Sequence, residues 1–287
     1  MQVEEGWIAV PGNVQLLGKR FRPTSSPLAL VVFIHGFLEH SGRYHQLAQT
    51  LSTAGYEVVT ADLRGHGRSG GVRVWIRQFA EYLADLEEIL RWARNGREDL
   101  PLFLLGHSMG GLIASLWATQ HPGRLIGLIL SAPAAKIGRI LPLAQFLAPL
   151  AALLLPWARI VRLGAKGLSQ DPQVVADFLA DPLVYHDRIP VRTGYEILRA
   201  ARQLCKTAHL LYDPLLILHG TADRVCSADG SQLLFDQAQA ADKTLRLYPG
   251  FYHDLFHEPG AAQVIDHVLQ WLERRIRTFP AGSQACG

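Results

Sequence analysis

The chain has 287 residues, of which 49% are hydrophobic, and its formal net charge is +3. This composition supports a large folded core and excludes an intrinsically disordered protein. The weak positive charge, without basic clusters interleaved with aromatic residues, argues against nucleic-acid binding. Three cysteines without a C-x-x-C pair indicate a reducing compartment and no disulfide framework. The first residues lack the apolar stretch of a signal peptide, so we expect a cytoplasmic protein.

The first half of the chain alternates between apolar runs typical of buried strands and stretches typical of helices. After short strands within residues 6–34, the expected order is a strand at 28–34, a helix at 44–54, a strand at 56–62, a helix at 76–94, a strand at 102–105, a helix at 111–120 and a strand at 125–131. Strands and helices that alternate at this spacing indicate a parallel sheet with helices on both faces.

This alternation stops at Pro133, and the chain from there to about residue 208 is expected to be helical, interrupted by prolines and without strands. It resumes with a strand at 215–219, a helix from about Ser231, a strand at 244–248 and a helix at 261–277. We therefore predict an α/β core made of residues 1–133 and 209–287. Residues 134–208 would form an inserted helical cap.

The stretch Leu102 to Ala114 contains the motif G-x-S-x-G, centred on Ser108, between an expected strand and an expected helix. This context is typical of a nucleophilic serine on a sharp turn at the carboxyl edge of a sheet. Gly106 and Gly110 leave room for such a strained turn. The N–H of Met109, at the start of the helix, is placed to stabilise a developing oxyanion. The alternative is a glycine-rich turn with an incidental serine.

A nucleophilic serine needs a histidine base and an acid that orients it, and two later strand ends supply both. Asp223 follows the strand at 215–219, and His253 follows the strand at 244–248. We expect both side chains at the carboxyl edge of the sheet, where sites of this fold class are built. Asp254 is a competing acid, but its position next to His253 does not favour an acid–base pair. His253 and His257 are spaced as a metal pair, yet no third ligand has suitable spacing, so we expect no metal.

Residues 65–70 form a literal G-x-G-x-x-G after a strand, which is the pattern of a dinucleotide-binding turn. That site needs a helix that opens inside the motif, and the residues that follow it here do not favour one. We interpret this stretch as a structural loop and expect no cofactor.

The motifs HGFLEHSGRY, DLRGHGRSGG, GHSMGG, DPLVYHDRIP, HGTADRVC and YHDLFHEP together resemble the monoacylglycerol lipase and lysophospholipase branch of the α/β-hydrolases. The resemblance spans most of the chain and is weakest over residues 134–180. It implies an α/β-hydrolase fold with Ser108 as nucleophile, Asp223 as acid and His253 as base, in the chain order of that superfamily. The backbone N–H groups of Phe37 and Met109 resemble its oxyanion hole.

Glu39 and Arg43, from E-H-S-G-R-Y, resemble a pair that lies near the glycerol headgroup in this branch. The alternative for these two residues is a salt bridge that orders their loop. The chain also departs from the pattern, because several members have a second histidine three residues after the base. Here the nearest histidine, His257, is four residues after His253.

The activity that the resemblance implies is cleavage of monoacylglycerols to fatty acid and glycerol, through an acyl-enzyme and without a cofactor. A lysophospholipase or general carboxylesterase on the same triad is the first alternative, because specificity lies in the cap. A non-catalytic binding module on the same fold is the second, and the presence of all three triad residues argues against it.

The segment Ile140 to Ala158 is uncharged and long enough on paper to span a bilayer. Prolines at 142, 149 and 156 interrupt it, and it lies between two halves of one expected sheet, so we predict that it rests on a membrane and does not cross it. The alternatives are a buried cap helix or a homodimer contact. Its flanks are basic, and residues 134–166 contain no acid; the flanking residues are Lys136, Arg139, Arg159, Arg162 and Lys166.

Overall fold

The computed structural model describes residues 1–138, 142–165 and 167–278, without the side chains of residues 142–145. Its strands are β1 (Gln2–Val10), β2 (Val14–Arg22), β3 (Leu30–Ile34), β4 (Glu57–Ala61), β5 (Leu102–His107), β6 (Gly127–Ser131), β7 (Arg159–Val161), β8 (Ile189–Pro190), β9 (Leu215–Gly220) and β10 (Lys243–Tyr248). Its α-helices are α1 (His45–Thr53), α2 (Ala80–Arg94), α3 (Met109–Gln120), α4 (Pro142–Leu154), α5 (Pro172–Ala180), α6 (Val191–Thr207), α7 (Ala228–Gln237) and α8 (Ala261–Thr278). Three short 3₁₀ helices are η1 (Ser41–Tyr44), η2 (Ala208–Leu210) and η3 (Leu255–His257).

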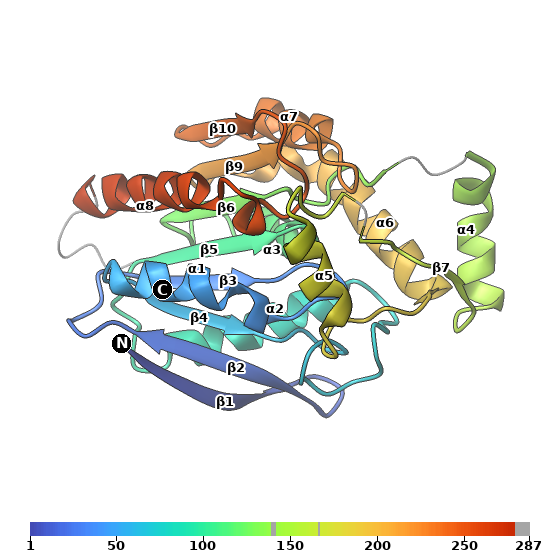
Figure 1. Cartoon of the computed structure of the whole chain (residues 1–287), viewed down its shortest axis with the longest axis horizontal. Helices are drawn as coiled ribbons and strands as arrows, with labels where there is room; N and C mark the ends of the chain where they lie inside the picture. The colour runs from blue at the N-terminus through green and yellow to red at the C-terminus, as the bar shows by residue number, and fades with distance from the viewer. Residues whose placement is uncertain (139–141, 166, 279–287) are drawn as a thin grey trace.

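Eight strands form one twisted sheet in the order β1-β2-β4-β3-β5-β6-β9-β10. The β1–β2 and β2–β4 pairs are antiparallel, and all other neighbours are parallel. Helices cover both faces of this sheet (Figure 1). The structure confirms the predicted α/β-hydrolase fold, with a mostly parallel central sheet.

The core lies in two apolar layers, because alternate side chains of each central strand point to opposite faces. In β3, Leu30, Val32 and Ile34 pack in the layer that contains residues of α2 and α3. Val31 and Phe33 pack in the other layer, with residues of α1 and α8. All five residues of β3 are buried, which explains why the central strands are continuous apolar runs in the sequence.

The helix expected from Ile76 begins only at Ala80. The backbone N–H of Ile76 donates to Thr193 Oγ1 and that of Phe79 donates to Glu196 Oε2, each at 3.2 Å. Side chains of α6 therefore satisfy N–H groups that an earlier helical turn would have used. The helix expected from Ser231 begins earlier, at Ala228, because Ser227 caps it by accepting from the N–H of Asp229 at 3.3 Å.

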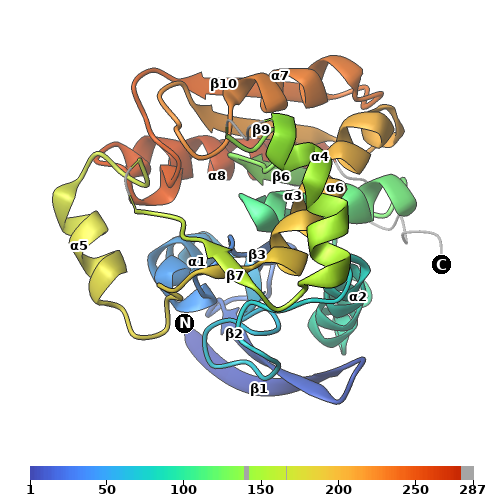
Figure 2. The same cartoon turned by 90° about the vertical axis from the view of Figure 1, so that its right-hand side faces the viewer.

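The segment between β6 and β9 contains α4, β7, α5, β8 and α6 (Figure 2). The prediction that it has no strands was wrong, because β7 and β8 form an antiparallel pair in which Val161 pairs with Ile189. These β-branched residues are separated by α5, so only tertiary contacts reveal the pairing. The division into a core and a cap at residues 134–208 stays a prediction.

Two contacts hold this segment against the core. Ile197, Ala200 and Leu204 of α6 belong to the same apolar layer as α2 and α3. The rings of Trp75 and Trp157 stack with their centroids 3.4 Å apart, which joins the residues after α4 to the loop before α2. Among the described residues, no helix is both long and apolar enough to cross a membrane. Ile140, at the start of the apolar segment, lies outside them.

Candidate active site

Ser108 occupies the turn between β5 and α3, with φ 54° and ψ −116°. The left-handed φ is strained for a residue with a side chain, and two glycines make the turn possible. A Cβ on Gly110 would lie 2.1 Å from the carbonyl oxygen of Ile34, and one on Gly106 would lie 2.4 Å from that of Gly110. The sequence G-x-S-x-G therefore folds into a sharp turn that no larger residue at either glycine would allow.

Ser108, His253 and Asp223 form a continuous hydrogen-bonded chain. Ser108 Oγ lies 2.8 Å from His253 Nε2, and His253 Nδ1 lies 2.7 Å from Asp223 Oδ2. Three separate connections bring them together, after β5, β9 and β10, at the carboxyl edge of the sheet. The serine and histidine side chains are almost fully buried, so the chain of hydrogen bonds is shielded from bulk water.

Asp223 is fixed as an ionised carboxylate. Its Oδ1 accepts from the N–H groups of Val225 at 2.7 Å and Cys226 at 3.0 Å. Burial opposes ionisation, but the His253 charge and hydrogen bonds from His219 and His253 lower the pKa of Asp223 below its usual range. Burial likewise opposes charging of His253, but the Asp223 carboxylate wins and raises the pKa of His253 above its ordinary value. A carboxylate in this position favours the charged form of the imidazole.

Met109 directly follows Ser108, and Phe37 lies in the loop that passes close to this serine. Met109 is the first residue of α3, so its N–H has no carbonyl partner within the helix. The loop after β3 passes close to Ser108, since a Cβ on Gly36 would lie 3.2 Å from Ser108 Cβ. Within the part of the chain that the structure describes, Phe37 N–H donates no hydrogen bond. Two backbone N–H groups near Ser108 are thus without a hydrogen-bond partner among the described residues.

Glu39 and Arg43 lie in a buried polar cluster behind that loop. Glu39 accepts from Gly36 N–H and the Tyr44 hydroxyl, each at 2.7 Å, and from Arg43 Nε at 3.0 Å. Arg43 also donates to Asp254 Oδ2 at 2.8 Å. Burial disfavours each charge, but the opposite charges win, so the pKa of Glu39 is lowered and that of Arg43 is raised. Glu39 therefore holds the backbone of Gly36, the residue directly before Phe37.

Sequence reasoning missed two contacts of the histidine and acid loops. His219, the penultimate residue of β9, lies 3.1 Å from Asp223 Oδ2 through its Nε2. Asp254, considered above as a rival acid, instead accepts from His257 Nδ1 at 2.8 Å. The sequence feature that could have indicated the His219 contact is its position near the end of β9, the strand that precedes Asp223.

His253 and His257, considered above as a metal pair, both contact groups of the protein itself. Among residues 1–138, 142–165 and 167–278, no group of three or more His, Cys, Asp or Glu side chains is arranged so that it could hold a metal ion. In the G-x-G-x-x-G stretch, the Arg68 N–H donates to Asp62 Oδ2 at 2.8 Å, and a Cβ on Gly67 would lie 2.1 Å from that oxygen. The glycine therefore makes room for a side chain of the protein itself.

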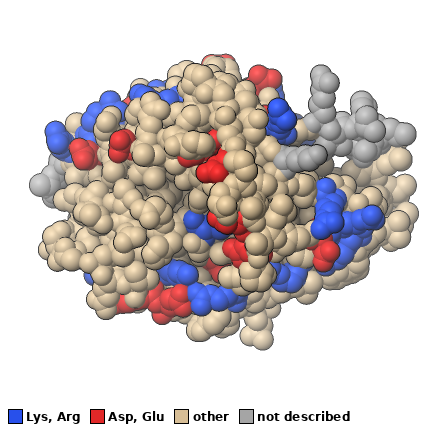
Figure 3. Space-filling model, viewed as in Figure 1, with Lys and Arg blue, Asp and Glu red and all other residues tan. Residues whose placement is uncertain are grey.

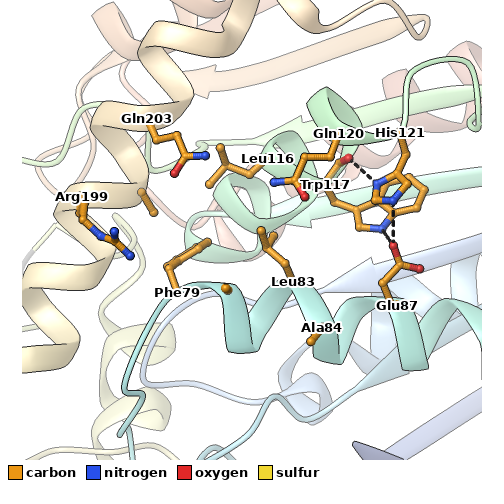
Figure 4. Close-up of a pocket in the computed structure, with 12 residues that line it drawn as sticks. Phe79, Leu83, Ala84, Glu87, Leu116, Trp117, Gln120, His121, Arg199 and Gln203 are labelled. Atoms are coloured by element: carbon orange, nitrogen blue, oxygen red, sulfur yellow. Dashed lines mark hydrogen bonds and ion pairs between the residues drawn. The ribbon is translucent and has the colours of Figure 1, made fainter. Parts of the chain in front are cut away.

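A separate groove of about 330 Å³ lies between α2, α3 and α6, and no triad residue lines it (Figure 4). Glu87 of α2 accepts from Trp117 Nε1 at 2.7 Å and pairs with His121 Nε2 at 3.1 Å. The His121 ring also stacks on Trp117. These contacts connect α2 to the end of α3, the helix that follows Ser108.

Comparison with known proteins identifies the family of the chain. The family model described as serine aminopeptidase, S33, matches residues 25–260. A monoacylglycerol lipase of Mycolicibacterium smegmatis is 37% identical over 91% of this chain and 94% of its own length. The monoglyceride lipase of Homo sapiens is 34% identical over 93% of this chain and 90% of its length. A soluble variant of the monoglyceride lipase of Saccharomyces cerevisiae, solved with a substrate analog, has a TM-score of 0.85 at 27% identity and covers 96% of each chain.

Proposed function

Because the chain belongs to the monoacylglycerol lipase branch of the α/β-hydrolase superfamily and is a hydrolytic enzyme, we propose that it cleaves monoacylglycerols to fatty acid and glycerol. The observation that carries this proposal is the unbroken hydrogen-bonded chain from Ser108 through His253 to Asp223. Its relatives supply the substrate class, because both curated relatives are named for monoacylglycerol or monoglyceride hydrolysis.

The proposed reaction proceeds in two acyl-transfer steps. His253 Nε2 takes the proton of Ser108 as Oγ attacks the ester carbonyl, and Asp223 stabilises the imidazolium. The N–H groups of Phe37 and Met109 stabilise the oxyanion, and one such donor contributes about 3 kcal/mol. The intermediate collapses to the acyl-enzyme as His253 protonates the departing glycerol oxygen. Water, deprotonated by His253, then attacks the acyl carbonyl and releases the fatty acid.

For Glu39 and Arg43 we propose a positioning role. The Glu39 carboxylate already accepts three hydrogen bonds, one of them from Gly36 beside the oxyanion donor. Direct contact with the glycerol end of the substrate is the alternative. A positioning role predicts that Glu39→Gln lowers turnover of monoolein and of a p-nitrophenyl ester by the same factor. A selective loss on monoolein would assign Glu39 to the headgroup instead.

The proposed substrate class is tested by hydrolysis of monoacyl-, diacyl- and triacylglycerols and of a lysophospholipid by the purified protein. We expect monoolein to be cleaved fastest, because a segment inserted between β6 and β9 restricts what reaches Ser108. Triolein cleaved as fast as monoolein would contradict the proposal. A faster lysophospholipid reaction would support the lysophospholipase alternative, and a preference for short soluble esters would support a general carboxylesterase.

We also propose that the cap docks on the surface of a membrane, where this substrate is dissolved. Seven apolar side chains of α4 and the residues after it are exposed by 45% to 80%: Phe146, Leu147, Leu150, Leu153, Leu154, Leu155 and Trp157. We call these seven residues the apolar cap surface. It stands at the outer edge of the molecule (Figure 1). Lys136, Arg159 and Arg162 flank it, which favours an anionic lipid surface, while Arg139 and Lys166 lie outside the described residues. A second copy of the chain is the alternative occupant.

A further inference from the structure

A hollow of about 500 Å³ opens between β7 and the segment that leads into β8. Three arginines, one tyrosine and one aspartate line it: Arg159, Arg162, Arg188, Tyr185 and Asp187. Basic side chains gather over this end of the molecule, on the right-hand side of Figure 3. Three cationic groups outweigh one carboxylate, so the charge of the hollow favours an anion.

The chain across the hollow holds two of the three guanidinium groups in place. Arg159 Nη1 donates to the Tyr185 hydroxyl and to the carbonyl oxygen of Arg188, the latter at 3.3 Å. Arg162 Nε donates to the carbonyl oxygen of His186 at 2.7 Å. The other N–H groups of both side chains remain for a ligand, and among the described residues none pairs with the Arg188 guanidinium. Guanidinium groups held in this way suit the bidentate recognition of phosphate oxygens.

The apolar neighbours of the hollow indicate what carries the phosphate. Ile160 and Val161, in β7 itself, are exposed by 59% and 51%, and Leu163 is exposed by 47%. Two arginines and three exposed apolar side chains are thus interspersed along residues 159–163, one residue after the end of the apolar cap surface. A free ion would use only the arginines. A phospholipid would use both, since its phosphate lies beside its acyl chains at the membrane surface.

We propose that this arginine hollow binds the phosphate of an anionic phospholipid headgroup. The proposal rests on the docking of the cap on membranes proposed above, and it gives that docking a defined headgroup site. Tyr185 connects the hollow to the active site, because its N–H donates to the carbonyl oxygen of Leu38 at 2.8 Å. Its ring also packs with Phe37 against the small apolar cluster that contains Leu38 and Ile189. Tyr185 therefore lines the hollow on one side and contacts the loop of the proposed oxyanion donor on the other.

The experiment compares flotation of the full chain with neutral phosphatidylcholine vesicles and with vesicles that also contain phosphatidic acid, at one ionic strength. We expect phosphatidic acid to raise the affinity by about tenfold or more, since each arginine near an anionic surface contributes roughly fivefold. Arg188→Gln and Arg188→Lys should both remove most of this gain. Glutamine lacks the charge, and lysine keeps the charge but lacks the planar guanidinium that can bind a phosphate through two N–H groups. Arg274→Gln and Arg274→Lys, on the exposed face of α8, are matched controls and should keep it. Thermal unfolding verifies that each variant is folded.

Two outcomes would overturn the proposal. Full retention of the gain in Arg188→Lys would mean that positive charge alone accounts for the added affinity and that no bidentate guanidinium–phosphate contact exists. Inorganic phosphate that binds the protein without vesicles as tightly as the lipid does would assign the hollow to the free ion. Binding to neutral vesicles reports on the apolar cap surface alone, and monoolein hydrolysis in detergent reports on the proposed function, so failure of either is distinguishable from failure of the headgroup site.

Discussion

Arg43 donates a hydrogen bond to Asp254 across 2.8 Å, although the two residues are 211 positions apart in the chain. The contact joins the loop of the proposed oxyanion donor to the loop of the proposed base, because Asp254 directly follows His253. Both side chains are buried, and Asp254 also pairs with His257. The two loops are therefore braced against each other by an ion pair and do not depend on surface contacts alone.

Asp254→Ala should destabilise the protein strongly. Arg43 keeps its pair with Glu39, but the loss of Asp254 leaves the buried Arg43 Nη2 and His257 Nδ1 without their acceptor, and breaking a buried ion pair typically costs about 3–5 kcal/mol. The measurement is urea unfolding of Asp254→Ala and of a matched control, Asp266→Ala, which lies on the exposed face of α8. The control should change stability by no more than about 0.5 kcal/mol. Equal stability of Asp254→Ala and the wild type would contradict a structural role for the Arg43 pair.

Ser108→Ala should remove nearly all ester hydrolysis and leave the fold intact. Loss of the nucleophile in a serine triad lowers turnover by a factor of about 10⁶. A fluorophosphonate probe should label the wild type and not the variant, and Ser131→Ala provides a matched control at another buried serine near the site. Labelling that survives in Ser108→Ala would place the nucleophile elsewhere.

The acidic limb of the pH profile should belong to His253. The imidazole must be neutral to take the serine proton, so kcat/KM should rise with pH through its pKa, which the Asp223 carboxylate holds above the ordinary value. Asp223→Asn removes that negative charge. The acidic limb should then move to lower pH. Turnover should fall by a factor of about 10⁴, because the carboxylate no longer holds the imidazole in the tautomer that can accept the serine proton. An unmoved limb would show that another group controls this ionisation.

The positions of Ser108, Asp223 and His253 could be predicted because each follows an expected strand, and parallel strands end at one edge of a sheet. The strain at Ser108 was likewise predictable from Gly106 and Gly110. The contacts of His219 and Asp254 were not, because they depend on how two loops meet in space. The β7–β8 pair was missed for a related reason: strands of three and two residues carry no periodic pattern, and tertiary contacts decide their pairing.

The last prediction concerns the apolar cap surface. Leu153→Asp with Leu154→Asp should abolish flotation with neutral and anionic vesicles alike, since each buried apolar side chain contributes about 1.5–3 kcal/mol and a charge opposes insertion. Leu247→Asp, an exposed leucine of β10, is the matched control and should float as the wild type does. Salt should weaken only the part of the binding that anionic lipid adds, because the apolar part is not screened. Retained flotation of the double variant would exclude the apolar cap surface as the docking site. If the wild type instead ignores every vesicle and sediments as a dimer that the double variant dissociates, the surface contacts a second copy of the chain, and the membrane proposal fails.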